Sequence, residues 1–309
     1  DSKNCTRCGE CEKVCQAVII RLQKVGNSSN GGVFAKGMAE DNSGRIQFIA
    51  FEKGIVNTLR NIEGPRPLLV AGAVGIVKYY QNMALQIIIQ KLDPGVPADD
   101  ISNLLPTGNF DREAYLDKFN SLVGQVKTPS LHQLLVRIFS EPFLSAFLKN
   151  PAGMKMHHAY SGGLLKHTVD VAELALAMAH TVGNGDKDLV LAGALLHDIG
   201  KVKEISAAVG FPYTTEGRLL GHISISALLV KKAADEIKLP LNQLQWLEHI
   251  ILSHHGEQDK GSPVACATKE SFLVHYADEV NAVMNQFEDQ EKHHTWVFNK
   301  MLQRYLFLD

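Results

Sequence analysis

The residues best placed to do chemistry are an adjacent imidazole and carboxylate, His197-Asp198, in the run Leu195-Leu196-His197-Asp198-Ile199-Gly200-Lys201. Such a pair at the end of an apolar helix is costly to bury unless a partner satisfies both groups. Further imidazoles and a carboxylate stand in or beside other apolar helical stretches: His167, His222, the pair His254-His255, and Asp278. An unpaired polar group there carries a desolvation penalty of about 1 to 3 kcal/mol. A common partner would satisfy all of these imidazoles and carboxylates, so together they are candidate ligands of a binuclear metal site.

The donor types narrow the choice of metal. Imidazoles and carboxylates suit Mn, Fe, Co, Ni or Zn, and a carboxylate can bridge two ions where an imidazole nitrogen holds one. Asp198 is therefore the natural bridge. Any one of the histidines alone would be interpreted as an ordinary core or surface residue, and only their combination favours a metal.

The longer C-terminal part of the chain, from Asp111 onward, has the apolar period of helices, which would carry these ligands. We expect helices over residues 111–125, 130–139, 141–149, 161–181, 187–197, 217–237, 241–253 and 268–287, with a helical tail over 290–307. The sequence therefore predicts an all-α domain over residues 111–309.

The first part of the chain has a different pattern. Segments rich in Val, Ile and Phe, separated by Gly, Asn, Ser and Pro, predict strands over residues 14–24, 32–41, 45–51, 68–78 and 84–92. Five short strands with a longer connection between the third and the fourth are typical of a closed Greek-key barrel of the OB type. We assign residues 1–15 to a cysteine-rich segment, 16–93 to the barrel and 94–110 to a linker containing prolines and glycines.

Composition limits the class of protein and of partner. The 309 residues are 45% hydrophobic and 21% charged, with a net charge of -2. This balance excludes a broad basic surface, so a nucleic acid would have to be held in a local groove. No apolar run reaches the roughly 18 residues of a membrane span, and no secretory leader is visible. We expect a cytoplasmic protein with no membrane partner, and a homo-oligomer stays open.

The order His, His-Asp, His, His, Asp resembles the HD superfamily of metal-dependent phosphohydrolases. Three segments, 157–168 (HHAYSGGLLKHT), 211–223 (FPYTTEGRLLGHI) and 250–257 (IILSHHGE), resemble more narrowly the 3′-to-5′ exoribonuclease family that joins an OB fold to an HD domain. The similarity runs from about Gly44 to Phe287. The resemblance implies a multi-domain α and β protein, with a small N-terminal OB-type β-barrel followed by an all-α HD domain.

The resemblance also implies a ligand set for two divalent ions. One ion would be held by His167, His197, Asp198 and Asp278, and the second by Asp198, His222 and His254, while His255 is either a ligand or a donor behind the ligands. Mn is the first choice of metal, with Fe, Co, Ni and Zn as alternatives. Two ions bridged by a carboxylate generate hydroxide at neutral pH and stabilise charge on phosphoryl oxygens.

Other residues are candidates for contact with the substrate. Lys201 lies one helical turn after His197 and would place a cation beside the scissile phosphate. Arg218 would clamp a phosphate, or is a surface arginine. His157 would line the substrate channel and His158 would protonate the leaving oxygen, unless both only cap the following helix. Asp170 would orient the imidazole three residues before it.

A barrel of this type holds single strands by stacking aromatics and a cationic groove. The available residues are Phe48, Phe51, Tyr79 and Tyr80, with Arg21, Lys36, Arg45, Lys53 and Lys78. About half of any such set points into the core, because side chains alternate along a strand. A barrel that grips single-stranded RNA or DNA beside a hydrolytic site predicts stepwise degradation from one end.

The cysteines Cys5, Cys8, Cys11 and Cys15 have the C-x2-C-x2-C-x3-C spacing of bacterial ferredoxins. No proline follows Cys15, and the residues around it read as the run into the first strand. An iron-sulfur cluster, a zinc ion and free thiols all stay open.

Three functions follow from these patterns. The first is a 3′-to-5′ exonuclease on single-stranded RNA, with DNA as an alternative substrate, that releases nucleoside 5′-monophosphates. The second is a nucleotide or cyclic-dinucleotide phosphohydrolase, against which the strand-holding barrel argues. The third is a redox-sensing nucleic-acid-binding protein with an iron-sulfur cluster, against which the intact set of metal ligands argues.

Overall fold

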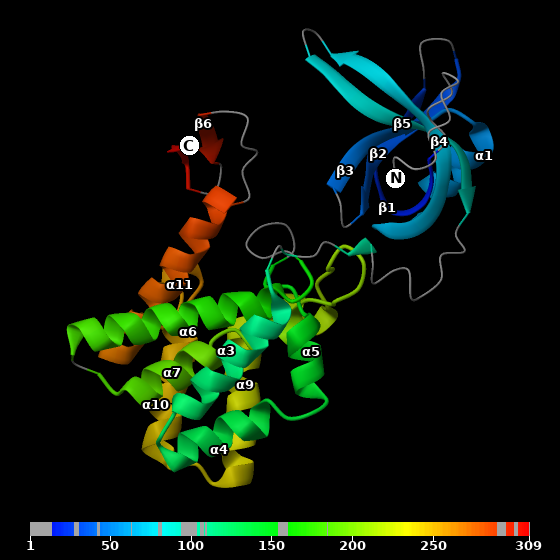
Figure 1. Cartoon of the computed structure of the whole chain (residues 1–309). Coiled ribbons are helices and arrows are strands. Elements are labelled where there is room, and N and C mark those ends of the chain that lie inside the picture. Colours follow the sequence, from blue (N-terminus) through cyan, green and yellow to red (C-terminus); the bar gives the residue numbers. More distant parts are fainter. Residues whose placement is uncertain are drawn as a thin grey trace. The chain divides into compact units, whose positions relative to one another are not determined.

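The computed structural model describes residues 14–27, 31–41, 44–62, 64–79, 82–93, 104–105, 108, 110–153, 160–183, 185–288, 295–299 and 302–308. It divides into two compact units (Figure 1). The first unit comprises residues up to Thr107 together with Ala208–Gly210, and the second comprises the rest. The predicted OB-type barrel lies in the first unit and the predicted helical domain in the second.

The first unit is a closed five-stranded barrel with the strand order β1-β2-β3-β5-β4. Its elements are β1 (Val14–Asn27), β2 (Val33–Asp41), β3 (Gly44–Ala50), α1 (Lys53–Arg60), β4 (Arg66–Tyr79) and β5 (Asn82–Asp93). Neighbouring strands are antiparallel except β3 and β5, which pair in parallel. The connection between the third and fourth strands contains α1. The prediction of an OB-type barrel is thus confirmed.

The core of the barrel follows from alternation along the strands. Ile20, Phe48, Val70 and Ile87 are buried, and α1 adds Ile55, Val56 and Leu59. Close approach of strands requires glycine at one point in particular. A Cβ on Gly72 would lie 2.3 Å from the carbonyl oxygen of Ile88, beside a register shift between β4 and β5.

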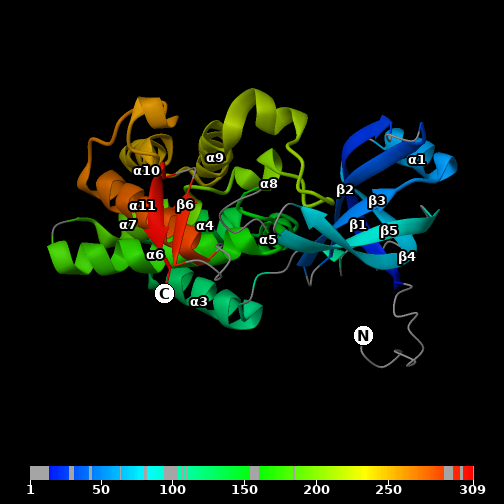
Figure 2. The same ribbon diagram turned by 90° about the horizontal axis from the view of Figure 1, so that it is seen from above.

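The second unit is built from helices around one apolar core. They are α3 (Arg112–Gln125), α4 (Pro129–Ile138), α5 (Phe143–Lys149), α6 (Gly163–Val182), α7 (Lys187–Leu196), α8 (Lys201–Glu204), α9 (Thr215–Ile237), α10 (Leu241–Ser253) and α11 (Lys269–Glu288). Every residue of α7 from Leu189 to Leu196 is buried. A helix that is apolar all round must be central, and α7 packs against α6, α10 and α11 (Figure 2).

The predicted helical tail over residues 290–307 is wrong. The described part of this segment forms a hairpin of two antiparallel strands, β6 (Trp296–Asn299) and β7 (Arg304–Phe307), seen in red beyond the end of α11 in Figure 1. Its apolar residues alternate along each strand, with Val297 and Leu306 on one side and Trp296 and Phe307 on the other. A period of two is the signature of a strand, and it decides the structure here.

Among the described residues, no helix is long and apolar enough to cross a membrane.

Candidate metal centre

The His197-Asp198 pair lies in the tight turn between α7 and α8. His197 caps the buried helix α7, and Gly200 ends the turn. A Cβ on Gly200 would lie 2.1 Å from the carbonyl oxygen of His222, and the Gly200 N–H donates to the Ser226 hydroxyl at 2.8 Å. The absence of a side chain at Gly200 therefore lets α9 lie directly on the turn and bring His222 to Asp198.

The other candidate ligands come from four helices that surround this turn. His222 follows Gly221, whose positive φ of 70° kinks α9. His254 is the residue at which α10 ends, His167 lies in the first turns of α6, and Asp278 lies in the middle of α11. Residues that are far apart in the sequence thus meet at one point.

Asp198 is at the centre, and its two carboxylate oxygens face different groups. Oδ2 lies 3.2 Å from His167 Nε2 and 3.4 Å from His197 Nε2. Oδ1 lies 3.4 Å from His222 Nε2 and 3.7 Å from His254 Nε2. A carboxylate with one oxygen toward each of two donor groups has the arrangement of a bridging ligand.

Asp278 stands on the Oδ2 side. Its Oδ1 lies 3.2 Å from His167 Nε2 and 4.0 Å from His197 Nε2. His255 stands on the opposite side, where one of its ring nitrogens lies within 4.8 Å of the ligand atoms of His222 and His254.

Each of the four inner imidazoles is held by its Nδ1, which leaves Nε2 directed at the centre. The acceptors are Ala194 O for His197 at 2.7 Å, Ile251 O for His254 at 2.7 Å, Glu204 Oε1 for His222 at 3.1 Å, and Asn281 Oδ1 for His167 at 2.8 Å. A carbonyl or carboxylate oxygen only accepts, so each Nδ1 carries a proton, and Nε2 is the ring nitrogen through which each imidazole would bind a metal.

The donor set fits a pair of divalent ions. Among the described residues, three buried side-chain polar atoms have no hydrogen-bond partner: Asp198 Oδ1, His222 Nε2 and His254 Nε2. Buried polar atoms without a partner are rare because each costs free energy. Here all three belong to one cluster, and ions bound on the two sides of Asp198 would satisfy them.

Charges in the centre are balanced by Lys201. Burial would raise the pKa of Asp198, but the Lys201 ammonium and His197 outweigh burial and hold that pKa well below its usual range. Burial would likewise lower the pKa of Lys201, and Asp198 instead raises it. The Lys201 Nζ lies 2.6 Å from Asp198 Oδ2, and its side chain is 16% exposed. Lys201 is therefore a charged donor beside Asp198.

The imidazoles differ in their protonation. Burial, together with neighbouring histidines, lowers the pKa of His254 and of His255, so both are neutral at pH 7 and have a lone pair for a metal. Burial acts in the same direction on His167, but its hydrogen bonds with Asp198 and Asp278 prevail and raise its pKa to about 9. An ion that binds His167 would thus displace a proton.

Not every predicted residue lies at the centre. Arg218 is exposed on α9, with its guanidinium carbon 5.1 Å from the centre of the Tyr213 ring, and no described contact joins it to the ligands. His157 and His158 lie outside the described residues. The prediction that Asp170 orients His167 is wrong, because Asp170 accepts hydrogen bonds from Tyr115 and Lys166 instead.

Two positioning residues were missed by the sequence analysis, namely Glu204 and Asn281. Asn281 follows Asp278 by three residues on the same face of α11, a spacing that could have pointed to it. Glu204 is a buried acid three residues after Lys201, and it accepts from both the backbone N–H and the Nδ1–H of His222. Its short helix α8 gave no periodic signal.

The barrel does not gather its candidate residues in the same way. Phe48 is fully buried and belongs to the core, whereas Phe51 is 53% exposed. Arg21 forms an ion pair with Glu40 at 3.3 Å. The described part of the structure does not include Tyr80 or the side chains of Tyr79 and Lys78.

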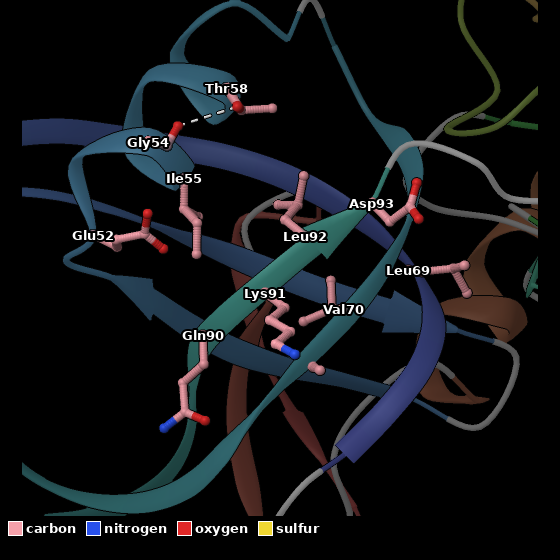
Figure 3. Close-up of a pocket in the computed structure, with 11 residues that line it drawn as sticks. Glu52, Gly54, Ile55, Thr58, Leu69, Val70, Gln90, Lys91, Leu92 and Asp93 are labelled. Atoms are coloured by element: carbon pink, nitrogen blue, oxygen red, sulfur yellow. Dashed lines mark hydrogen bonds between the residues drawn. The ribbon is translucent and has the colours of Figure 1, made fainter.

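A cavity of about 570 Å³ lies between α1 and the strands β4 and β5 (Figure 3). The carboxylates of Glu52 and Asp93 and the ammonium of Lys91 are among the groups that line it. Two carboxylates to one ammonium is the wrong balance for a phosphate backbone, so this cavity is not the groove that was predicted for a strand.

The cysteine segment lies almost wholly outside the described residues. Cys5, Cys8 and Cys11 are not described, and Cys15 lies in β1, paired with Ala71 of β4. Cys266 is a free thiol that contacts the carbonyl oxygen of Ser253 at 3.2 Å. An iron-sulfur cluster or zinc ion at the four cysteines stays a prediction.

Comparison with known proteins matches the HD domain family over residues 164–283, a span that includes every candidate metal ligand. The HD domain implies that the chain binds divalent metal. The chain is similar over most of its length to the 3'-5' exoribonuclease YhaM of Bacillus subtilis, with 33% identity covering 90% of this chain and 87% of that protein. YhaM of Bacillus velezensis is also 33% identical, over 88% of this chain and 86% of its own length.

Proposed function

We propose that this chain, which belongs to the family of 3'-5' exoribonucleases that includes YhaM, degrades single-stranded RNA from its 3′ end with two divalent ions and releases nucleoside 5′-monophosphates. The observation that carries the proposal is the pair of donor groups on the two sides of Asp198, with three buried atoms that lack a partner. Single-stranded DNA is a second substrate of the same chemistry, and Mn is the metal we propose.

His167, His197, Asp198 and Asp278 would hold one ion, and Asp198, His222 and His254 the other. His255 would complete the second group, because its ring nitrogen lies with those of His222 and His254. When bound, the two ions supply Lewis acidity toward water and toward the phosphate ester.

The chain's own groups prepare the reaction around the ions. Asn281 and Glu204 fix the tautomer and direction of His167 and His222. The Lys201 ammonium is held charged at Asp198 and would donate to a phosphoryl oxygen, where negative charge builds up in the transition state. We retain Arg218 and His157 as proposed substrate contacts and His158 as the proposed acid for the leaving oxygen.

The barrel supports a strand as the substrate. A closed barrel of OB topology is a common holder of single strands, and a small nucleotide or cyclic dinucleotide would need no such module. We therefore place the barrel on the RNA upstream of the end that is cut.

The experiment is a degradation assay with one RNA labelled at either end. A 3′-to-5′ exonuclease releases a labelled mononucleotide at once from 3′-labelled RNA, and shortens 5′-labelled RNA in a ladder. A panel of nucleotides and cyclic dinucleotides runs in parallel with the same metal. Hydrolysis of the panel with RNA left intact would refute the proposal in favour of the phosphohydrolase alternative.

A further inference from the structure

The C-terminal hairpin presents a row of exposed aromatic rings that the proposed chemistry does not use. Trp296, Phe298, Tyr305 and Phe307 are 60%, 45%, 66% and 50% exposed. We call these four residues the aromatic ladder. They lie on one face, since Trp296 is paired with Phe307 across the strands and Phe298 with Tyr305. The ring centroids are 5.1 Å apart in the first pair and 5.2 Å in the second.

The opposite face of the hairpin explains why the ladder points outward. Leu306 and Asn299 are buried, and the Asn299 side-chain amide donates to the buried Gln286 of α11 at 2.9 Å. The hairpin is thus fixed to the end of α11, the helix that carries Asp278 (Figure 1). The ladder is a fixed face of the second unit and not a fraying end.

The ladder is a large apolar patch for a solvated surface. An aromatic side chain offers roughly 150 to 250 Å² for burial, so four half-exposed rings leave roughly 400 Å² of ring surface in water. That is as large as the largest apolar patch of a typical monomer, which often marks an interaction site. It is also about half of the roughly 800 Å² that each partner buries in a standard interface.

The α11 helix offers more apolar surface on the same unit. Val280, Met284 and Phe287 are 44%, 54% and 38% exposed and follow one another at intervals of four and three residues, which places them on one face. This stripe is further apolar surface on the helix to which the hairpin is bonded.

Within the part of the hairpin that the structure describes, the charges do not suit a nucleic acid as the occupant of the ladder. Within the described part of the hairpin the single cation is Arg304, and its Nε donates to Leu302 O at 3.0 Å, back onto its own turn. A stacking platform for RNA also needs cations that follow the phosphates. A partner that presents apolar rings of its own suits the ladder better.

We infer that the aromatic ladder is a self-association surface, on which a second copy of this chain docks ladder against ladder about a two-fold axis. An isologous contact places the same rings on both sides, and aromatic pairs gain from edge-to-face packing beyond their area. The hairpin is also a sheet of only two described strands, and a short sheet of this kind can be extended by the strands of a copy. This inference does not depend on the proposed function.

The test is the mass of the full metal-loaded chain in solution, measured by light scattering and sedimentation from nanomolar to high micromolar concentration. We expect twice the 34.0 kDa of one chain at the upper end. The double variant Phe298→Thr with Tyr305→Thr keeps residues that favour strands and removes the ring pair nearer the turn, and should weaken association by at least about a hundredfold. The matched control is Trp246→Ser, which removes an exposed ring of α10 and should leave the mass unchanged.

A spectroscopic measurement keeps the test independent of variants that misfold. The chain has two tryptophans, so Trp246→Phe leaves Trp296 as the sole reporter. Its emission should shift to the blue as concentration rises through the dimer transition. A mass of one chain at every concentration, or a dimer that the double variant leaves intact, would overturn the inference. A monomer whose Trp296 emission responds only to single-stranded RNA would also overturn it, and would assign the ladder to the substrate.

Discussion

At the metal centre, buried polar atoms lack hydrogen-bond partners and converge on Asp198, whereas the described polar groups of the barrel are paired within the sheet or face solvent. In the helical unit, buried polar atoms of Asp198, His222 and His254 lie together without hydrogen-bond partners, and burying each of them costs free energy. Their clustering at one point indicates that a ligand binds there. The described part of the barrel incurs no comparable cost. Its topology suggests a class of ligand, but its side chains do not single out one groove.

The helical unit contains the same contrast between two of its own carboxylates. Asp188 and Asp198 stand at the two ends of one buried helix, α7. Asp188 accepts from Lys127 N, Thr128 N and the Thr128 hydroxyl at 2.9, 2.6 and 2.7 Å, so its carboxylate is satisfied within the protein. Asp198 has an oxygen without a partner. A satisfied carboxylate supports the fold, while an unsatisfied one at a cluster of imidazoles is available for chemistry.

The largest effect is expected for Asp198→Asn, which is nearly isosteric but is a poor bridge. It should lower RNA hydrolysis by at least about a thousandfold, because both ions lose a ligand. The measurement is the rate of mononucleotide release, with circular dichroism as the check on folding. Asp170→Asn, a partly buried carboxylate bonded to Lys166, is the matched control and should keep most of the activity. An equal loss of RNA hydrolysis in the two variants would contradict the assignment of Asp198 as the bridging metal ligand.

A smaller and more selective effect is expected for the two positioning residues. Glu204→Ala should weaken the ion near His222, and Asn281→Ala the ion near His167, each by about 10- to 100-fold in affinity. Glu204→Gln keeps an acceptor for the His222 Nδ1–H and should restore much of the loss. Metal titration followed by counting the ions bound per chain separates the sites. If each alanine variant loses both ions together, Glu204 and Asn281 do not each support one ion.

For the barrel, the contrast lies between a buried and an exposed phenylalanine. Phe51→Ala should leave stability unchanged and weaken binding of single-stranded RNA by about tenfold, as expected for the loss of one stacked base. Phe48→Ala should lower the free energy of unfolding by about 3 to 5 kcal/mol, since it removes a core ring. The checks are RNA affinity by fluorescence anisotropy and urea unfolding. Unchanged RNA affinity in Phe51→Ala would exclude that face of the barrel as the strand holder.

The smallest effect is expected at Asp188. Burial would raise its pKa, but the hydrogen bonds from Thr128 and Lys127 prevail and lower it. A lowered pKa stabilises the folded state at pH values above the unfolded pKa, about 3.9, and this contribution is lost as the pH falls through the folded pKa. Asp188→Asn should therefore cost about 1 kcal/mol near neutrality, because the carboxylate is partly exposed, and less in acid. A loss that grows toward low pH in urea unfolding would contradict this sign.

The sequence predicted much of this architecture, because strong periodicity survives tertiary packing. The barrel strands and most helices lie within a few residues of their predicted bounds, and Asp198 was expected to bridge two groups of ligands. The hairpin at Trp296–Phe307 was missed, since four residues per strand are too short to outweigh a preceding helical pattern.

The positioning residues show a different limit. Asp170 has helical spacing from His167, yet Asn281 holds that imidazole. The choice depends on how α11 packs against α6, a tertiary contact that no local pattern encodes. In the same way, Glu204 reaches His222 only because α9 lies on the turn at Gly200.

The central claim is that Asp198 bridges two ions, and the most direct test is to count them. The chain is purified under conditions that retain metal, loaded with Mn, freed of excess ion, and measured by elemental analysis against protein concentration. We expect two ions per chain, and loss of both in Asp198→Asn with the fold retained. One ion per chain in the wild type, or two that persist without the Asp198 carboxylate, would contradict it.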